Sequence, residues 1–283
     1  TLTSEFLAPT HEVGQFSAQA RRLPVSSNSN YGWINGVDET SRVAGSRWGG
    51  IRGYRMAEAA TKTASAPKFR RINWELKKYA VLVYGTDELL QDAAQFSAVV
   101  RQGVGEELVF MLNDDILNGD GAAGPLGIMQ SGALVTVSKA AGQAADTILY
   151  TNLVSMWSRL LPRSKASAAW FVNSDCMPQL DSLALPVGTG ALEPRFVSYG
   201  PDGIMRIKGK PVYETEFNAT VGDLGDIVLA DMSQYLMWEK AGIQEAQSIH
   251  VQFLTDETVF RFVYRCDGQS ALASALTPYK GSN

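Results

Sequence analysis

The longest regular pattern in the chain runs from residue 86 to residue 118 and is typical of one amphipathic helix. Apolar residues recur there at three- and four-residue steps, with acids between them. Thr86 can cap the helix because its hydroxyl can accept a free backbone N–H of the first turn. Gly103 and Gly105 weaken the middle, so we expect a bend or close packing there. The apolar positions are Leu89, Leu90, Ala93, Phe96, Val100, Val104, Leu108, Met111, Leu112 and Ile116.

A two-residue alternation before this helix predicts strands. Apolar and polar residues alternate over residues 72–76, and the apolar register slips by one residue after Lys78. We expect a bulge or a change of burial at the slip, so that the second half of the segment enters a sheet. Small and polar residues fill 59–67 between two extended runs. The segment 40–85 therefore predicts a long two-stranded hairpin, which is marginally stable alone.

The rest of the chain predicts a mixed α+β protein. Residues 1–35 show no sustained period and contain a Ser/Asn-rich run at 26–30, so we expect an extended arm. Two further helices are expected at 147–161 and 175–185. Strands or strand-rich regions are expected at 168–172, 199–217, 226–236, 249–253 and 258–265. A chain of 283 residues with these patterns suggests about two compact units.

Charge is distributed unevenly between these segments. The whole chain has a formal charge of -4, which gives no overall basic field for wrapping nucleic acid. Residues 40–85 hold ten lysines and arginines and two acids, a net +8, which leaves -12 on the remainder. The segment 86–118 carries -6. A basic hairpin on an acidic body is either a solvated surface feature or an arm for an acidic surface on another molecule.

Candidate chemistry is sparse. The chain has two cysteines, Cys176 and Cys266, and two histidines, and no G-x-S-x-G motif, so we predict no catalytic, cofactor or metal site. The glycine-rich stretch 117–128 lacks the P-loop pattern and is expected to be a turn that ends the helix. We expect His250 to be packed or hydrogen-bonded, the cysteines to be small buried fillers, and three aspartates to cap turns. Those aspartates are Asp120, Asp231 and Asp267. No stretch reaches the length of apolar residues that a membrane helix requires, so no membrane partner is predicted.

Several separated motifs then resemble, in order, the major capsid proteins of tailed bacteriophages, the family with the Hong Kong 97 fold. Gly85 to Asp92 is similar to the start of the family's long spine helix, and 117–121 with 125–128 to its end. The segments 169–173 and 207–212 are similar to the core of its axial domain. The segment 225–235 comes next, and a spaced series from Ser248 to Gly268 completes the match. The order and spacing of the motifs make the resemblance specific.

The resemblance implies a Hong Kong 97-type capsid fold with four parts. Residues 1–38 would form an N-terminal arm and 39–85 an extended loop built as a long β-hairpin. Residues 86–128 and 227–269 would form a peripheral domain with the spine helix. Residues 129–226 and 270–283 would form an axial domain around the axis of a hexamer or pentamer.

In this family the extended loop lies over a neighbouring subunit's peripheral domain, which turns the charge asymmetry into a contact hypothesis. Opposite charges would steer the seam, and apolar burial, with Ile72 and Trp74 among the contributors, would supply more of the affinity. The expected contacts of the loop are Arg47, Trp48, Ile51, Arg52, Tyr54, Arg55, Lys62, Lys68 and Arg70. The expected contacts of the spine helix are Asp87, Glu88, Asp92, Glu106, Glu107, Asp114 and Asp115.

The resemblance also implies partners. They are identical subunits in hexamers and pentamers, a portal, decoration proteins, and double-stranded DNA enclosed without sequence-specific binding. The place is a virion capsid assembled in the host bacterial cytoplasm. A start at Thr1 resembles the product of a head-maturation protease, so we expect a longer precursor. One family member joins subunits by an isopeptide bond between a Lys and an Asn, assisted by a Glu. Asp256 and Val263 stand at the Asn and Glu positions, so cross-linking is not expected.

Other functions fit parts of the pattern. An encapsulin-type compartment or the shell of a gene transfer agent would share the fold. A hydrolase that uses Asp120, Asp231 or His250 is a remote alternative from another class. Such an enzyme would run on gel filtration near 30.7 kDa and show turnover, whereas a shell protein would form particles of megadalton size.

Overall fold

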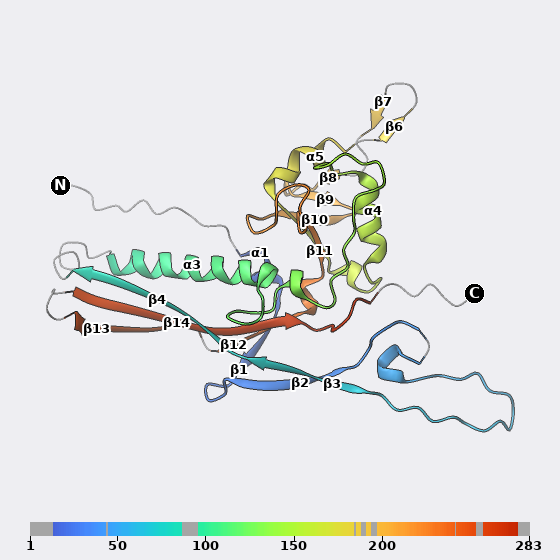
Figure 1. Cartoon of the computed structure of the whole chain (residues 1–283), viewed down its shortest axis with the longest axis horizontal. Coiled ribbons are helices and arrows are strands. Elements are labelled where there is room, and N and C mark those ends of the chain that lie inside the picture. The colour runs from blue at the N-terminus through green and yellow to red at the C-terminus, as the bar shows by residue number, and fades with distance from the viewer. Residues whose placement is uncertain are drawn as a thin grey trace.

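A computed structural model describes most of the chain. The described residues are 14–43, 45–86, 96–183, 185–187, 191–193, 197–240, 242–252 and 257–276. The molecule has an elongated part, made of a long helix lying on a sheet, a second smaller α/β part, and a hairpin that projects from the first (Figure 1). Among these residues no helix is both long and apolar enough for a membrane span.

The larger sheet has five strands in two branches. Its strand order is β1-β12-β14-β13, and β4 pairs with the other edge of β14. β4 runs antiparallel to β14 in an unbroken register from Thr86 opposite Glu257 to Lys77 opposite Cys266. The strands are β1 Arg21–Val25, β4 Lys77–Thr86, β12 Tyr235–Lys240, β13 Gln244–Gln252 and β14 Glu257–Ser270.

Helix α3, Phe96–Asn118, covers one face of this sheet. Its buried side chains include Val104, Leu108, Leu112 and Ile116, which belong to one core with β4 and β14. The predicted helix is therefore confirmed from Phe96 onward, and residues 87–95 lie outside the described part. The close packing expected at Gly103 and Gly105 is wrong. A Cβ at either position would have no other segment of the chain within 4 Å.

The predicted N-terminal arm is wrong for its described residues up to 25. Helix α1, Gln15–Gln19, places Phe16 in the core with 0% of its surface exposed, stacked on Phe171 with ring centroids 4.3 Å apart. β1 then adds in parallel to β12. A five-residue helix is too short to show a period, so the sequence looked irregular.

Asn113 of α3 fastens this N-terminal segment to the body. Its side chain is fully buried, accepts the backbone N–H of Ser17 at 2.9 Å and donates to the Val109 carbonyl at 2.6 Å. Gly14 permits the close approach, because a Cβ there would lie 2.3 Å from Asn113 Nδ2. The first described turn of the chain is therefore part of the folded unit.

The projecting hairpin differs from its prediction in one strand. β2, Tyr31–Val37, pairs antiparallel with β3, Phe69–Glu75, so the first strand lies inside the segment expected as the arm. Within the described residues 38–68, the only assigned element is the short turn η1, Arg47–Gly50, in which Trp48 and Gly49 have positive φ values of 50 and 69 instead of helical backbone. The expected change at the register slip is confirmed: β3 ends at Glu75, Leu76 is buried, and β4 enters the large sheet.

The second sheet has the order β11-β5-β10-β9-β8 and carries its own core. β11 pairs antiparallel with β5, so the expected domain boundary before residue 227 separates two strands of one sheet. The helix predicted at 147–161 is confirmed, whereas that at 175–185 is shorter and follows a 3₁₀ turn. The elements are α4 Tyr150–Arg159, β5 Ala169–Val172, η4 Ser174–Cys176, α5 Met177–Asp181, β8 Val197–Tyr199, β9 Met205–Ile207, β10 Lys210–Glu214 and β11 Ile227–Ala230.

Short elements complete the described chain. Turns connect α3, α4 and β12 to their neighbours, and β6 pairs with β7 in a small hairpin. These elements are η2 Ile128–Gln130, η3 Ser164–Ala166, β6 Leu185–Val187, β7 Ala191–Glu193 and η5 Met232–Gln234. The main core is continuous between the two parts, because Phe171 and Val228 of the second sheet pack in it.

Candidate intersubunit surfaces

The base of the hairpin is locked to the body by aromatic packing. Trp74 of β3 stacks on Trp238 of β12 with ring centroids 6.2 Å apart, and Ile72 and Leu76 are buried beside them. Ile72 and Trp74 were expected to bury apolar surface against a neighbouring subunit. That expectation is wrong, because both side chains pack within their own chain.

Polar contacts fix the same joint. Asp267 accepts the backbone N–H of Glu75 at 2.8 Å, and Leu76 donates its N–H to the Asn30 carbonyl at 2.8 Å. Burial raises the pKa of Asp267, although hydrogen bonds from two backbone amides act in the opposite direction. Arg70, an expected intersubunit contact, donates to the Ala271 carbonyl of its own chain. These hydrogen bonds hold the base of the hairpin against the body.

The loop 38–68 carries the remaining predicted loop residues outward, away from the body (Figure 1). Trp48, Ile51 and Tyr54 are exposed, and the guanidinium of Arg52 lies 5.3 Å from the centre of the Tyr54 ring. The cations Arg47, Arg55, Lys62 and Lys68 are exposed as well. The structure therefore brings exposed apolar and cationic side chains together in this loop.

One backbone contact closes the loop. Lys68 donates its N–H to the Gly49 carbonyl at 2.8 Å, which joins the two sides of the loop above the hairpin. Gly49 has φ +69, and a Cβ there would lie 2.5 Å from the Lys68 carbonyl oxygen. Glycine is thus required by conformation and by space.

The hairpin also exposes aromatic residues that the sequence reasoning missed. Tyr31 is 76% exposed, Trp33 56% and Phe69 63%. In the observed register Tyr31 lies opposite Glu75, Trp33 opposite Asn73, and Val37 opposite Phe69, so these residues share one face. The opposite face holds Ile72 and Trp74. The alternation of side chains along a strand could have predicted this exposed face, but only if β2 had been recognised as the partner of β3.

The predicted acids of α3 fall into three groups. Asp115 points into its own chain, where its carboxylate accepts the Tyr79 hydroxyl, and burial raises its pKa. Asp115 therefore bonds within its own chain and does not, as had been expected, face a neighbouring subunit. Glu106, Glu107 and Asp114 lie on the outer side of the helix, where Glu106 accepts Gln102 Nε2 at 2.9 Å. The remaining predicted acids, Asp87, Glu88 and Asp92, lie outside the described residues.

The other face of the large sheet has the opposite charge. β4 and β14 place Lys78 opposite Arg265 and Leu82 opposite Arg261, on the side away from α3. Leu82 is exposed, and Arg261 is exposed beside it. The helix side of this layer is therefore acidic and its sheet side basic, although the body as a whole is acidic.

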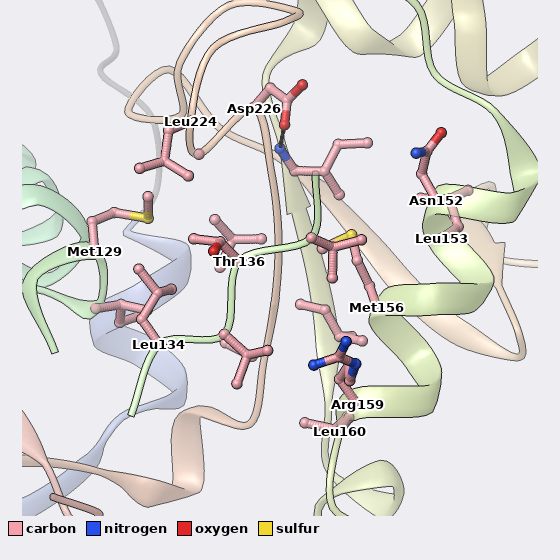
Figure 2. Close-up of a pocket in the computed structure, with 18 of the residues that line it drawn as sticks. Met129, Leu134, Thr136, Asn152, Leu153, Met156, Arg159, Leu160, Leu224 and Asp226 are labelled. Carbon is pink, nitrogen blue, oxygen red and sulfur yellow. Dashed lines mark hydrogen bonds between the residues drawn. The ribbon is translucent and has the colours of Figure 1, made fainter. Parts of the chain in front are cut away.

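A cavity of about 550 Å³ lies between α4, β11 and the extended segment before α4 (Figure 2). Its wall is mostly apolar, with Leu134, Met156 and Leu160 among the labelled residues. Asp226 at its rim accepts the backbone N–H of Ile227 at 2.7 Å. No group of three or more His, Cys, Asp or Glu in the described chain has a metal-binding arrangement.

The polar residues considered for catalysis have structural roles. Asp120 accepts the N–H of Ala122 at 2.8 Å, and Asp231 accepts the N–H of Ser233 at 3.2 Å, which confirms both as turn caps. Asp267 lies inside β14 and holds the hairpin base through the Glu75 N–H, so it is not the turn cap that was expected. His250 is exposed rather than packed, but its backbone N–H donates to Ser248 Oγ at 3.3 Å, so the expected hydrogen bond is present.

The glycine-rich turn and the cysteines match expectation. Gly127 donates to the Gly119 carbonyl at 2.8 Å, and Asp120 forms a β-bridge with Leu126, which confirms a structural turn after α3. Cys176 and Cys266 are fully buried free thiols, and burial raises the pKa of Cys176 to about 11.

A helix-backed sheet, a smaller α/β part and a projecting hairpin with an exposed apolar and cationic loop define a structural subunit built to contact other chains. Comparison with known families agrees with this class. The chain belongs to the phage capsid family, whose model matches residues 1–281. It is a structural major capsid protein, not an enzyme.

Solved structures show that the fold is of the Hong Kong 97 type. The capsid of an empty GTA particle has a TM-score of 0.75 at 15% identity and covers 98% of this chain and 93% of its own. A chain of Microbacterium phage Oxtober96 has a TM-score of 0.66 at 15% identity, covering 98% and 90%. A chain of Mycobacterium phage Adephagia has a TM-score of 0.64 at 10% identity, covering 100% and 97%. No curated protein sequence matches the chain.

Proposed function

We propose that identical copies of this chain assemble as hexamers and pentamers into an icosahedral head that encloses double-stranded DNA. The observation that carries the proposal is the loop 38–68, which projects from the body with exposed apolar and cationic side chains. Monomeric proteins rarely expose large contiguous apolar patches, so such a loop is suited to burial against another copy.

The loop would lie on the helix side of a neighbouring subunit. Glu106, Glu107 and Asp114 give that side a charge opposite to the loop, whereas the far side of the sheet repels it through Arg261 and Arg265. Each exposed ion pair would contribute about 0 to 1 kcal/mol. Apolar burial at about 25 cal/mol per Å² would contribute more of the affinity.

The overall charge of the chain also suits a container for DNA. The chain carries a formal charge of -4, with 29 acidic residues against 25 lysines and arginines. An acidic wall would not neutralise phosphates or release their counterions, so packaged DNA would not bind tightly to it.

Further partners follow from the family resemblance. They are a portal, decoration proteins, and a head-maturation protease that acts on a longer precursor. Assembly would take place in the host bacterial cytoplasm, and the product would be a virion capsid.

A shell of the gene-transfer-agent type is a second candidate, because a GTA capsid is among the similar structures. Sequencing the DNA in purified particles separates the two. One repeated phage genome supports the head of a phage, whereas fragments drawn from a bacterial chromosome support the second candidate.

Negative-stain microscopy of the purified chain tests the proposal. We expect closed shells of megadalton mass. A stable species near 30.7 kDa under all salt conditions would contradict shell formation by this chain.

A further inference from the structure

The outer face of the hairpin, defined by Tyr31, Trp33 and Phe69, is uncovered by any described element. All three side chains are more than half exposed and lie on one face of a two-stranded ribbon. A cation already stacks there, since the Arg71 guanidinium lies 5.2 Å from the centre of the Trp33 ring. This face therefore has the chemistry of a surface that takes cationic and apolar side chains.

A groove lies at the end of this face nearest the body. It has a volume of about 660 Å³ and lies between the hairpin and the turn after α3. Tyr31, Trp33 and Trp74 supply aromatic walls. Three carboxylates line it, Glu75, Asp120 and Asp267, against one lysine, Lys77. Lys77 lies 3.5 Å from one oxygen of Glu75, and Asp267 is buried and accepts two backbone N–H groups, so Asp120 and the second oxygen of Glu75 are the groups left to meet a cation. The groove is thus aromatic and acidic at the same place.

We propose that this groove and the outer hairpin face receive the loop 38–68 of a second copy of the chain. The inference rests on the proposed function and specifies where part of the loop is received. The loop offers matching chemistry: Arg52, Arg55 and Lys62 are exposed and form no ion pair within the described chain. An arginine fits an aromatic wall edged by carboxylates, because it can stack and form hydrogen bonds together.

The loop of the same chain cannot fill this groove. Tyr31 and Glu75 mark the groove end of the hairpin, and Val37 and Phe69 mark the loop end. Six residue steps at about 3.4 Å separate those ends by roughly 20 Å. The loop continues away from the body beyond that point (Figure 1). A second copy is therefore the occupant that the geometry favours.

Such a contact is head-to-tail. Each hairpin would offer its loop to one neighbour and its base to another, and an interface of this kind forms a ring when the rotation between copies closes. The contact would link adjacent hairpins directly, in addition to any contact between the loop and α3.

Site-specific disulfides test the inference in assembled particles. The first variant pairs Ala57→Cys in the loop with Asn73→Cys on the outer hairpin face, both at exposed positions. The second pairs Ala57→Cys with Met111→Cys on the outer side of α3. Cys176 and Cys266 are buried, so the wild-type chain controls for background. Oxidised particles are analysed by non-reducing electrophoresis.

We expect the Asn73→Cys pair to give intersubunit dimers and longer ladders. Adding Glu75→Lys and Asp120→Lys should remove that cross-link, and adding Arg52→Glu and Arg55→Glu to this variant should restore it. Dimers from the Met111→Cys pair alone would overturn the inference and leave the proposed function intact. Particles without either cross-link would overturn it too. Failure of the wild-type chain to form particles would contradict the proposed function itself.

Discussion

Replacing Phe16 by alanine tests whether the N-terminal segment belongs to the folded body. The ring is fully buried, stacks on Phe171 at 4.3 Å and meets the edge of Phe217 at 6.5 Å. Removing a buried phenylalanine costs about 3–5 kcal/mol, and lost aromatic pairs add roughly 0.5–1.5 kcal/mol. We therefore expect Phe16→Ala to lower the free energy of unfolding by at least about 3 kcal/mol.

Phe69→Ala is the matched control, because the same side chain is removed from a position that is 63% exposed. Its unfolding free energy should change by no more than about 0.5 kcal/mol. Urea unfolding of the unassembled chain, followed by tryptophan fluorescence, measures both. Equal stability of the two variants would show that Phe16 is not in the core and that residues 14–25 form a free arm.

Three further results are expected. Asp115→Asn should stabilise the chain near neutral pH, because the raised pKa of Asp115 makes ionisation costly in the fold. That gain in stability should vanish below about pH 4, where the carboxyl is protonated in both the folded and the unfolded chain. Thermal unfolding measured across this pH range tests the prediction, and a gain in unfolding temperature that does not change with pH would refute it. Gly49→Ala should strain the loop closure and reduce particle yield without lowering the unfolding temperature of the body, and unchanged yield would argue against the closure. Reversing Arg47, Arg52 and Arg55 to Glu should reduce assembly and its salt dependence, as measured by light scattering. Wild-type behaviour of that triple variant would exclude the electrostatic seam.

Local sequence patterns were sufficient to predict the elements that are long enough to repeat their hydrophobic period several times. α3 shows its buried face over four turns, so the sequence could predict which side packs on the sheet. Asp115 lies seven residues after Leu108 and three after Leu112, and therefore shares that face. Its inward orientation could have been predicted from the same period, but charge alone had placed it among the contacts.

Long-range pairing could not be predicted in the same way. β2 contains Gly32, Asn35 and Gly36, which favour turns in isolation, and its pairing with β3 spans the whole loop. Once this register is known, parity puts Trp74 inside and Trp33 outside. The candidate surface therefore depended on a contact between distant segments, which the local pattern does not encode.

The prediction for the N-terminal segment was wrong for a related reason. Phe16 is the side chain that anchors α1 in the core. The hydrogen-bond partner of Ser17 in this helix is Asn113, which lies 96 positions further along the chain. One apolar residue in a short helix gives no period. The stabilising partners become visible only when the two segments are folded together.

Hydrogen exchange measured on assembled particles and on the unassembled chain tests the central claim most directly. If the loop 38–68 is buried against identical copies, its backbone amides between residues 51 and 66 should exchange much more slowly in particles, while those of α3 near Leu108 are protected in both states. Equal, fast exchange of the loop amides in both samples would contradict the account.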